Sequence, residues 1–106
     1  MTDRRIVITG IGVISPLGND LASTWEAMKA GRSGIDTIKS MDVTGYSTKI
    51  AGEVKDFDPA PYFKTPKDAR RVDRFTHFAM GAAGMALKDS GLDLEAEDKT
   101  RIGVMV

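Results

Sequence analysis

The chain has 106 residues, of which 15 are basic, 15 acidic and 42% apolar, with one histidine and no cysteine. This length allows at most one domain, and a net charge of zero argues against a nucleic-acid-binding protein, which would be strongly basic. The lack of cysteine excludes a disulfide framework, a thiolate metal site and a cysteine nucleophile within these residues.

The first predicted element is a strand. Residues 5–14 form a nearly continuous apolar run rich in β-branched side chains, and Ser-Pro-Leu-Gly at 15–18 closes it. A run without alternation is typical of a central strand covered on both faces, as in a layered α/β protein. The basic pair at 4–5 could begin an export leader, but polar residues and glycines interrupt the run and no cleavage site follows. We expect no leader, no membrane span and a cytoplasmic protein.

A helix is expected next. Asn19 would be its N-cap, and Gly31 would supply the left-handed residue that ends it. Three apolar residues at helical spacing predict a stripe that faces a core: Leu21, Trp25 and Met28.

Between residues 32 and 64 the signal for regular structure weakens, and only 48–54 predicts a short strand. Three carboxylates in this stretch, Glu53, Asp56 and Asp58, could bind a cation. Their spacing lacks the dense oxygen ligands of a calcium loop, which favours a solvated surface.

The clearest helix begins at Thr65, with Pro66 in the first turn and an acid three residues after the cap. A continuous helix over 66–90 would be about 37 Å long at ~1.5 Å per residue, and Gly91 would end it. Gly81 and Gly84 each cost about 1 kcal/mol in mid-helix relative to alanine. They therefore predict a buried helix that another helix or sheet approaches closely.

After an acidic linker, residues 101–106 predict a second buried strand. Two strands and two amphipathic helices would leave long unpaired sheet edges, which promote aggregation. We therefore expect residues 1–106 to be the N-terminal part of a larger α/β fold.

Two glycines between the first strand and the first helix, Gly10 and Gly12, raise the possibility of a dinucleotide-binding fingerprint. Ser15 stands at the third glycine position, Pro16 breaks the turn, and no acidic strand end follows about 20 residues on. A Rossmann nucleotide-binding half is therefore only a distant alternative. The glycines are better explained by close backbone packing.

The single histidine, His77, lies between Phe75 and Phe78 in the long predicted helix. No cysteine or second histidine is present to complete a metal site or a catalytic pair. We expect a packed, structural histidine.

A basic stretch at 64–74 holds five bases and two acids, Asp68 and Asp73, a local excess of three positive charges. The bases are Lys64, Lys67, Arg70, Arg71 and Arg74. Several of these bases can lie on one face of the predicted helix. They occupy its first turns, where the helix dipole disfavours each cation by a few tenths of a kcal/mol. This placement favours a surface for an acidic partner, with a solvated face as the alternative.

Several stretches, taken in order, resemble the elongating β-ketoacyl-acyl-carrier-protein synthases of the synthase II type. They are RRIVITGIGVISPLGN (4–19), STWEAMKAGRSGI (23–35), AGEVKDF (51–57), RRVDRF (70–75), DSGL (89–92) and TRIG (100–103). The likeness covers essentially the whole chain and is loosest at 58–65.

The resemblance implies a thiolase-like fold with α-β-α-β-α layers, normally a homodimer, of which residues 1–106 would be roughly the first quarter. It also implies a 3-oxoacyl-[acyl-carrier-protein] synthase, an acyltransferase of fatty acid biosynthesis. Such an enzyme condenses malonyl-carrier protein with an enzyme-bound acyl group and releases carbon dioxide. It needs no cofactor, because the substrates arrive on the phosphopantetheine of the acyl carrier protein.

No catalytic, cofactor-binding or metal-binding residue of the family carries over. The chain has no cysteine, and His77 lies in neither histidine motif of the family, so the 106 residues alone should be inactive. The resemblance does carry over a carrier-protein-binding site at Lys67, Arg70 and Arg71, with weaker matches at Lys64 and Arg74. A polyketide ketosynthase and a non-catalytic carrier-protein-binding module remain open alternatives.

Overall fold

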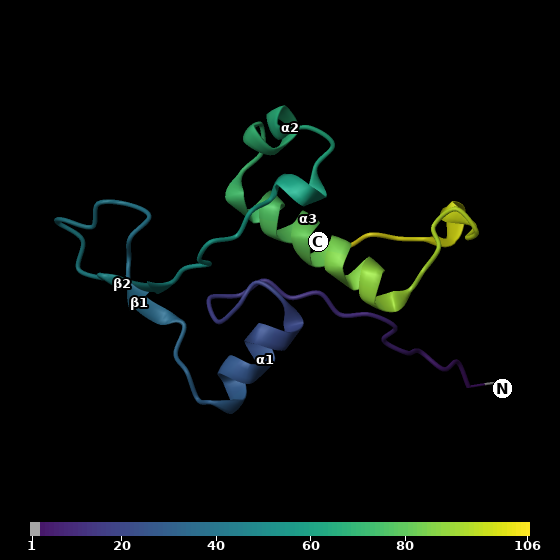
Figure 1. The fold of residues 1–106 in the computed structure, drawn as a ribbon, viewed down its shortest axis with the longest axis horizontal. Helices are drawn as coiled ribbons and strands as arrows, with labels where there is room; N and C mark the ends of the chain where they lie inside the picture. Colours follow the sequence, from purple (N-terminus) through teal and green to yellow (C-terminus); the bar gives the residue numbers. More distant parts are fainter. Residues whose placement is uncertain (1–2) are drawn as a thin grey trace.

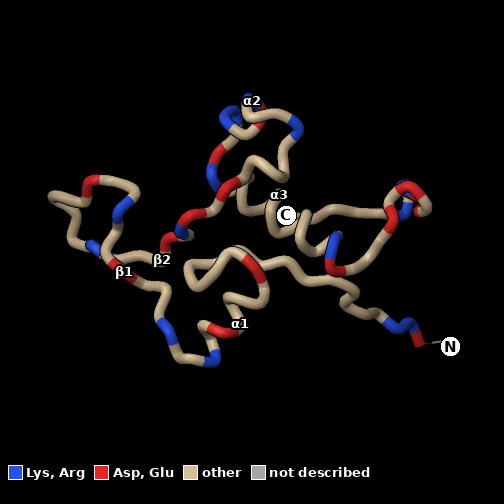
Figure 2. The backbone as a smooth tube through the Cα atoms, in the orientation of Figure 1, with Lys and Arg blue, Asp and Glu red and all other residues tan. Residues whose placement is uncertain are grey.

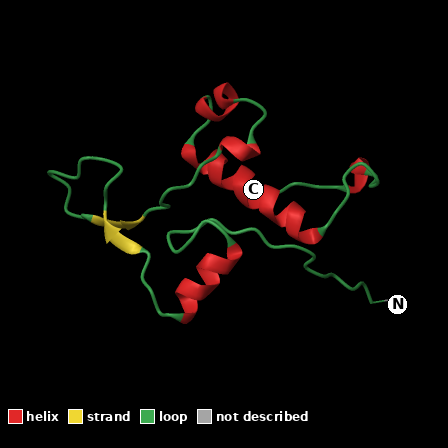
Figure 3. Ribbon diagram, viewed as in Figure 1, coloured by secondary structure: helices red, strands yellow, loops and turns green. Residues whose placement is uncertain are grey.

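The computed structural model describes residues 3–106. Within this range the chain forms helices, two short strands and 3₁₀ turns, joined by long irregular segments (Figures 1 and 3). In chain order the elements are α1 (Leu21–Lys29), β1 (Ile35–Thr37), β2 (Ile50–Gly52), the 3₁₀ turn η1 (Ala60–Tyr62), α2 (Pro66–Arg70), α3 (Arg74–Ser90) and the 3₁₀ turn η2 (Lys99–Arg101).

These elements are spread out rather than gathered around one core. The Cα radius of gyration is 17.4 Å, against about 13 Å for a compact domain of about 100 residues. The described residues expose 8849 Å², whereas a folded monomer of this mass would expose about 5,800 Å². Among residues 3–106 the buried apolar residues are Ala27, Phe57 and Ala69. The large apolar side chains are therefore mostly uncovered.

The prediction of a strand at 5–14 is wrong. The segment is irregular and passes beside α3 (Figure 1). No strand among residues 3–106 lies beside it to form the ladder that a strand requires. Its glycines do pack closely, as predicted: a Cβ on Gly12 would lie 2.7 Å from the Ala86 backbone nitrogen, and one on Gly10 would lie 2.6 Å from that of Ser90.

The first helix begins one residue later than the sequence predicts. Asp20, not Asn19, is the N-cap of α1, and its carboxylate accepts a hydrogen bond from the Ser23 amide at 2.7 Å. Asn19 instead donates from Nδ2 to the Lys55 carbonyl oxygen at 2.7 Å, which ties this corner to the segment after β2. At the other end Gly31 has a φ of +65°, so the predicted left-handed end is confirmed.

The apolar stripe of α1 does not face a core. Trp25 is 55% exposed and Met28 56% exposed. The buried face of α1 instead consists of Thr24 and Ala27, and the Thr24 hydroxyl lies 3.2 Å from that of Ser15. The predicted helical spacing of the stripe is therefore correct, but the prediction that the stripe faces a core is wrong.

Strands β1 and β2 form a two-stranded antiparallel sheet in which Asp36 pairs with Ala51. The strand predicted within 48–54 is confirmed as β2. Glu53, directly after β2, accepts backbone hydrogen bonds from Lys39 at 2.8 Å and from Ser40 at 3.1 Å, which anchors the chain that leaves β1.

The helix predicted over 66–90 is two helices, α2 and α3, with a break at 71–73. Asp73 has extended backbone (φ −75°, ψ 164°), and its carbonyl oxygen accepts from the Thr76 and His77 amides to begin α3. Gly91, with a φ of +66°, ends α3 as predicted.

The helix α3 is covered on one side only, so the prediction of a buried helix is wrong. Phe75 is 69% exposed. The two helix glycines do admit close neighbours, but these are side chains of irregular segments and of η1. A Cβ on Gly81 would lie 2.5 Å from the Phe57 ring and one on Gly84 2.7 Å from the Tyr62 ring.

The prediction of a strand at 101–106 is also wrong. Asp98 caps η2 through a 3.0 Å hydrogen bond from the Thr100 amide, and the residues after η2 are irregular. Val104 is 87% exposed, and Ile8 of the N-terminal segment is 83% exposed. The two segments predicted as buried strands are thus among the most exposed apolar parts of the chain. No helix in residues 3–106 is long and apolar enough to cross a membrane.

Candidate functional site

The predicted binding residues lie together on α2 and its C-cap. Lys67 and Arg70 belong to α2, Arg71 is its C-cap, and all three are exposed. Figure 2 shows the blue segments gathered around α2. We call Lys67, Arg70 and Arg71 the basic turn.

The first turn of α2 is fixed locally. The Thr65 hydroxyl oxygen accepts from the Asp68 amide at 3.2 Å and donates to the Asp68 carboxylate at 2.9 Å. This arrangement satisfies an amide that a helix start leaves free, and it confirms the cap that the sequence predicts. It also engages the acid nearest to the basic turn.

No ion pair within residues 3–106 involves the basic turn. The salt bridges of this part of the chain join Lys29 to Glu26, Lys39 to Asp36 and Lys99 to Glu95. Three exposed cations on one short turn therefore present positive charge to solvent. Such a surface attracts an anionic partner over roughly one Debye length, about 8 Å at physiological ionic strength.

Arg74, a weaker candidate from the sequence, has a different role. Its guanidinium lies 4.9 Å from the centre of the Phe78 ring and 5.8 Å from that of Phe57. Its Nη1 also donates to the Phe57 carbonyl oxygen at 3.3 Å. Arg74 therefore holds the start of α3 against the segment before η1. Lys64 is exposed and directly precedes the α2 cap.

His77 is a structural residue, as predicted. Its Nε2 lies 2.6 Å from the Ala69 carbonyl oxygen, and its ring packs edge-on against Phe63 at 5.6 Å. Because a carbonyl oxygen can only accept, Nε2 carries the proton. The other ring nitrogen, Nδ1, is buried and has no hydrogen-bond partner among the described residues.

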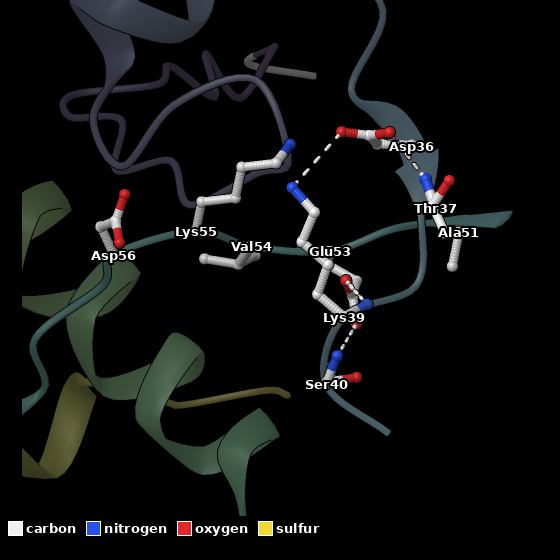
Figure 4. Close-up of a pocket in the computed structure, with 9 residues that line it drawn as sticks. All are labelled: Asp36, Thr37, Lys39, Ser40, Ala51, Glu53, Val54, Lys55 and Asp56. Carbon is white, nitrogen blue, oxygen red and sulfur yellow. Dashed lines mark hydrogen bonds and ion pairs between the residues drawn. The ribbon is translucent and has the colours of Figure 1, made fainter. Parts of the chain in front are cut away.

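The structure also has an open groove of about 400 Å³ between β1 and the segment after β2 (Figure 4). Lysines and carboxylates alternate along it, and Lys39 Nζ lies 3.9 Å from Asp36. Hydrogen bonds from the Ser40 hydroxyl and the Lys39 amide lower the pKa of Glu53. The carboxylate of Glu53 thus fixes the backbone at Lys39 and Ser40 by accepting hydrogen bonds from it. The spacing of residues in the sequence did not indicate this role.

The carboxylates considered as cation ligands do not converge. Glu53 accepts from backbone amides, and Asp58 accepts from the Ala60 amide at 3.0 Å at the start of η1. Within residues 3–106 no three metal-ligating side chains group together. The basic turn therefore remains the candidate site, and its chemistry is electrostatic binding.

Residues 3–106 match the family model of the β-ketoacyl synthase N-terminal domain. The chain belongs to this family, which confirms the resemblance seen in its sequence.

Among curated proteins, the 3-oxoacyl-[acyl-carrier-protein] synthase 2 of Vibrio cholerae is 46% identical over all of this chain and 25% of its own length. The synthases 2 of Coxiella burnetii and of Staphylococcus aureus strain COL are each 45% identical. The chain thus spans about a quarter of the length of the curated relatives it matches.

Among solved structures, the ishigamide ketosynthase/chain length factor superposes with a TM-score of 0.78 at 37% identity. The match covers 89% of this chain and 23% of that one. The open arrangement described above is therefore similar to part of a larger ketosynthase.

Proposed function

We propose that this chain is the N-terminal part of a 3-oxoacyl-[acyl-carrier-protein] synthase of fatty acid elongation. The observation that carries the proposal is the identity of 45–46% over essentially the whole chain to synthases 2 of several bacteria. The match is not confined to one motif, since it spans the basic turn, the irregular middle and both apolar segments.

The proposed reaction joins two acyl groups. A cysteine thiolate takes the acyl group from its carrier thioester and releases the carrier thiol. Malonyl-carrier protein then loses carbon dioxide, and the resulting carbanion attacks the enzyme thioester, so that the thiolate leaves and 3-oxoacyl-carrier protein forms. A thiolate suits this role because it is both a strong nucleophile and a good leaving group.

Residues 1–106 contain no cysteine, so this chemistry belongs to other parts of the proposed synthase. What this chain contributes is binding and framework. We assign the basic turn to the acyl carrier protein, whose acidic surface would meet Lys67, Arg70 and Arg71. The substrates need no further cofactor, because the carrier's own phosphopantetheine presents them.

The exposed apolar segments support a larger body. Residues 6–8 and 104–106 are each mostly exposed, with Ile6 at 92% and Val106 at 98%. In the proposed synthase they become strands of the α-β-α-β-α layers once neighbouring strands complete their ladders. A homodimer in the cytoplasm is the expected state of such an enzyme.

A second candidate is a ketosynthase of polyketide assembly. The observation in its favour is the likeness, at 37% identity, to the ishigamide ketosynthase/chain length factor, which is named as a ketosynthase and not as a fatty acid synthase. The elongating synthase takes precedence because the identity to the synthases 2 is higher and extends over the whole chain.

The test is a condensation assay on the purified protein from its source. We expect a polypeptide close to four times 11.5 kDa, which converts acyl-enzyme and malonyl-carrier protein to 3-oxoacyl-carrier protein with release of carbon dioxide. A native polypeptide of 11.5 kDa that binds carrier protein without condensation would instead identify a non-catalytic binding module.

A further inference from the structure

The side chain of His77, in α3, contacts the backbone within the basic turn. His77 Nε2 donates to the Ala69 carbonyl oxygen, and Ala69 lies within α2, between Lys67 and Arg70. The contact therefore joins the middle of the basic turn to the one long helix of residues 3–106.

The Ala69 carbonyl needs such a donor. A helix leaves its last four carbonyl groups without intrahelical partners, and α2 has only five residues. The chain then leaves the helical path, because Arg71 is the C-cap and Asp73 is extended. His77 supplies the missing N–H from the first turns of α3.

The position of the His77 ring is itself fixed. Phe63 packs edge-on against it at an interplanar angle of 79°, so the ring is confined on a second side. The Ala69 side chain, 7% exposed, packs inward at the same point. The histidine thus holds α2 at one place.

We infer that His77 is a positioning residue for the basic turn: it sets where Lys67, Arg70 and Arg71 meet the partner. This inference rests on the proposed function, in which the partner is the acidic acyl carrier protein. Loss of the hydrogen bond lets α2 move against α3, and all three cations move together. Their charge stays the same, so the effect appears as weaker docking alone.

The test compares two substitutions in the complete synthase. His77→Phe keeps an aromatic ring against Phe63 and removes the donor, whereas His77→Gln keeps a side-chain N–H that can reach Ala69. Steady-state constants are measured with an acyl group on the carrier protein and with the same group on N-acetylcysteamine, which has no protein to dock. For His77→Phe we expect KM for the carrier substrate to rise about three- to tenfold, the range that one net hydrogen bond supports.

The same variant should keep its kcat and its N-acetylcysteamine kinetics, and His77→Gln should return the carrier KM to within about twofold of the unsubstituted enzyme. A carrier KM unchanged in His77→Phe overturns the inference, and so does an equal loss on both substrates. If His77→Phe aggregates, His77→Leu is measured in its place. If both aggregate while His77→Gln folds, the histidine stabilises the fold rather than the docking, which also overturns the inference.

A charge-reversed variant, Lys67→Glu with Arg70→Glu, separates this inference from the proposed function. If it raises the carrier KM while His77→Phe does not, only the role of His77 fails. If neither variant changes the carrier KM, the docking role of the basic turn fails as well, and the inference fails with it.

Discussion

The backbone amide of Ile11 donates to the Asp89 carboxylate at 2.9 Å, although the two residues are 78 positions apart. This hydrogen bond joins the irregular N-terminal segment to the last turns of α3. It lies beside the close packing of Gly10 and Gly12 on the same helix. Within residues 3–106 the segment is therefore positioned by one helix.

Removal of this acceptor should loosen the segment. In the complete synthase, Asp89→Ala should raise amide hydrogen exchange at 5–14 by about fivefold, since a net hydrogen bond is worth about 1 kcal/mol. Asp89→Asn keeps a carbonyl oxygen and should raise it less than threefold. Equal exchange in all three proteins would show that this hydrogen bond does not position the segment.

Because the backbone of α3 lies so close to Gly12, we expect a substitution of Gly12 to lower stability more than the loss of the Asp89 acceptor does. A Cβ there would lie 2.7 Å from the Ala86 backbone nitrogen, and backbone cannot give way as a flexible side chain can. Gly12→Ala should lower the free energy of unfolding by about 1–3 kcal/mol, the usual cost of overpacking, as measured by urea unfolding of the synthase.

The matched control for Gly12 is Gly31→Asn. A Cβ on Gly31 would meet nothing within 4 Å, and asparagine tolerates the left-handed end of a helix. This substitution should change stability by less than about 1 kcal/mol. A Gly12→Ala protein as stable as the control would mean that the segment does not contact α3 closely.

Local signals in the sequence predicted the ends of the helices well. The Thr65 cap and the left-handed Gly31 and Gly91 follow from chemistry within a few residues, and all three are observed. The N-cap of α1 differs by one position because Asn19 is drawn to Lys55, 36 residues away. No pattern in the residues around Asn19 indicates such a distant partner.

The strands were predicted poorly because a strand depends on its neighbour. Residues 5–14 and 101–106 have the right composition, but no second strand lies beside either in residues 3–106. The break between α2 and α3 was missed for a related reason. Arg74 contacts Phe57, and His77 contacts Ala69, and these contacts between segments fix a turn that helical periodicity alone would pass through.

The basic stretch at 64–74 was visible in the sequence as charge at helical spacing, whereas the choice of Lys67, Arg70 and Arg71 within it came from the family resemblance. The contact of Arg74 with Phe57 was not predictable, because Phe57 lies 17 residues earlier in the chain, in an irregular segment.

Charge reversal at the basic turn should weaken carrier-protein binding. Lys67→Glu with Arg70→Glu should raise the dissociation constant at least tenfold at low salt, and the difference should shrink as added salt screens the charges. Lys29→Glu with Lys99→Glu makes the same change in net charge away from α2, at exposed ion pairs that contribute little. Titration calorimetry should give unaltered binding for that control; equal weakening in both variants would indicate an effect of net charge alone.

The hydrogen-bonded carboxylate of Glu53 should make the stability of the protein depend on pH. Its hydrogen bonds hold its pKa below the ordinary value of 4.5, so its contribution to stability is present above pH 4.5 and is lost as the pH falls through the lowered pKa. The stability difference between the unsubstituted protein and Glu53→Gln should therefore be larger at pH 6 than at pH 3.5. Urea unfolding at several pH values measures it, and a difference that grows towards acid would contradict the assigned hydrogen bonds.

We expect the rest of a larger condensing enzyme to cover the exposed apolar segments of this chain. Calorimetry with sedimentation on residues 1–106 alone is the sharpest test. We predict aggregation, or a monomer with no cooperative heat absorption, because Ile8 and Val104 remain more than four-fifths exposed. A sharp two-state transition of an 11.5 kDa monomer would contradict this expectation.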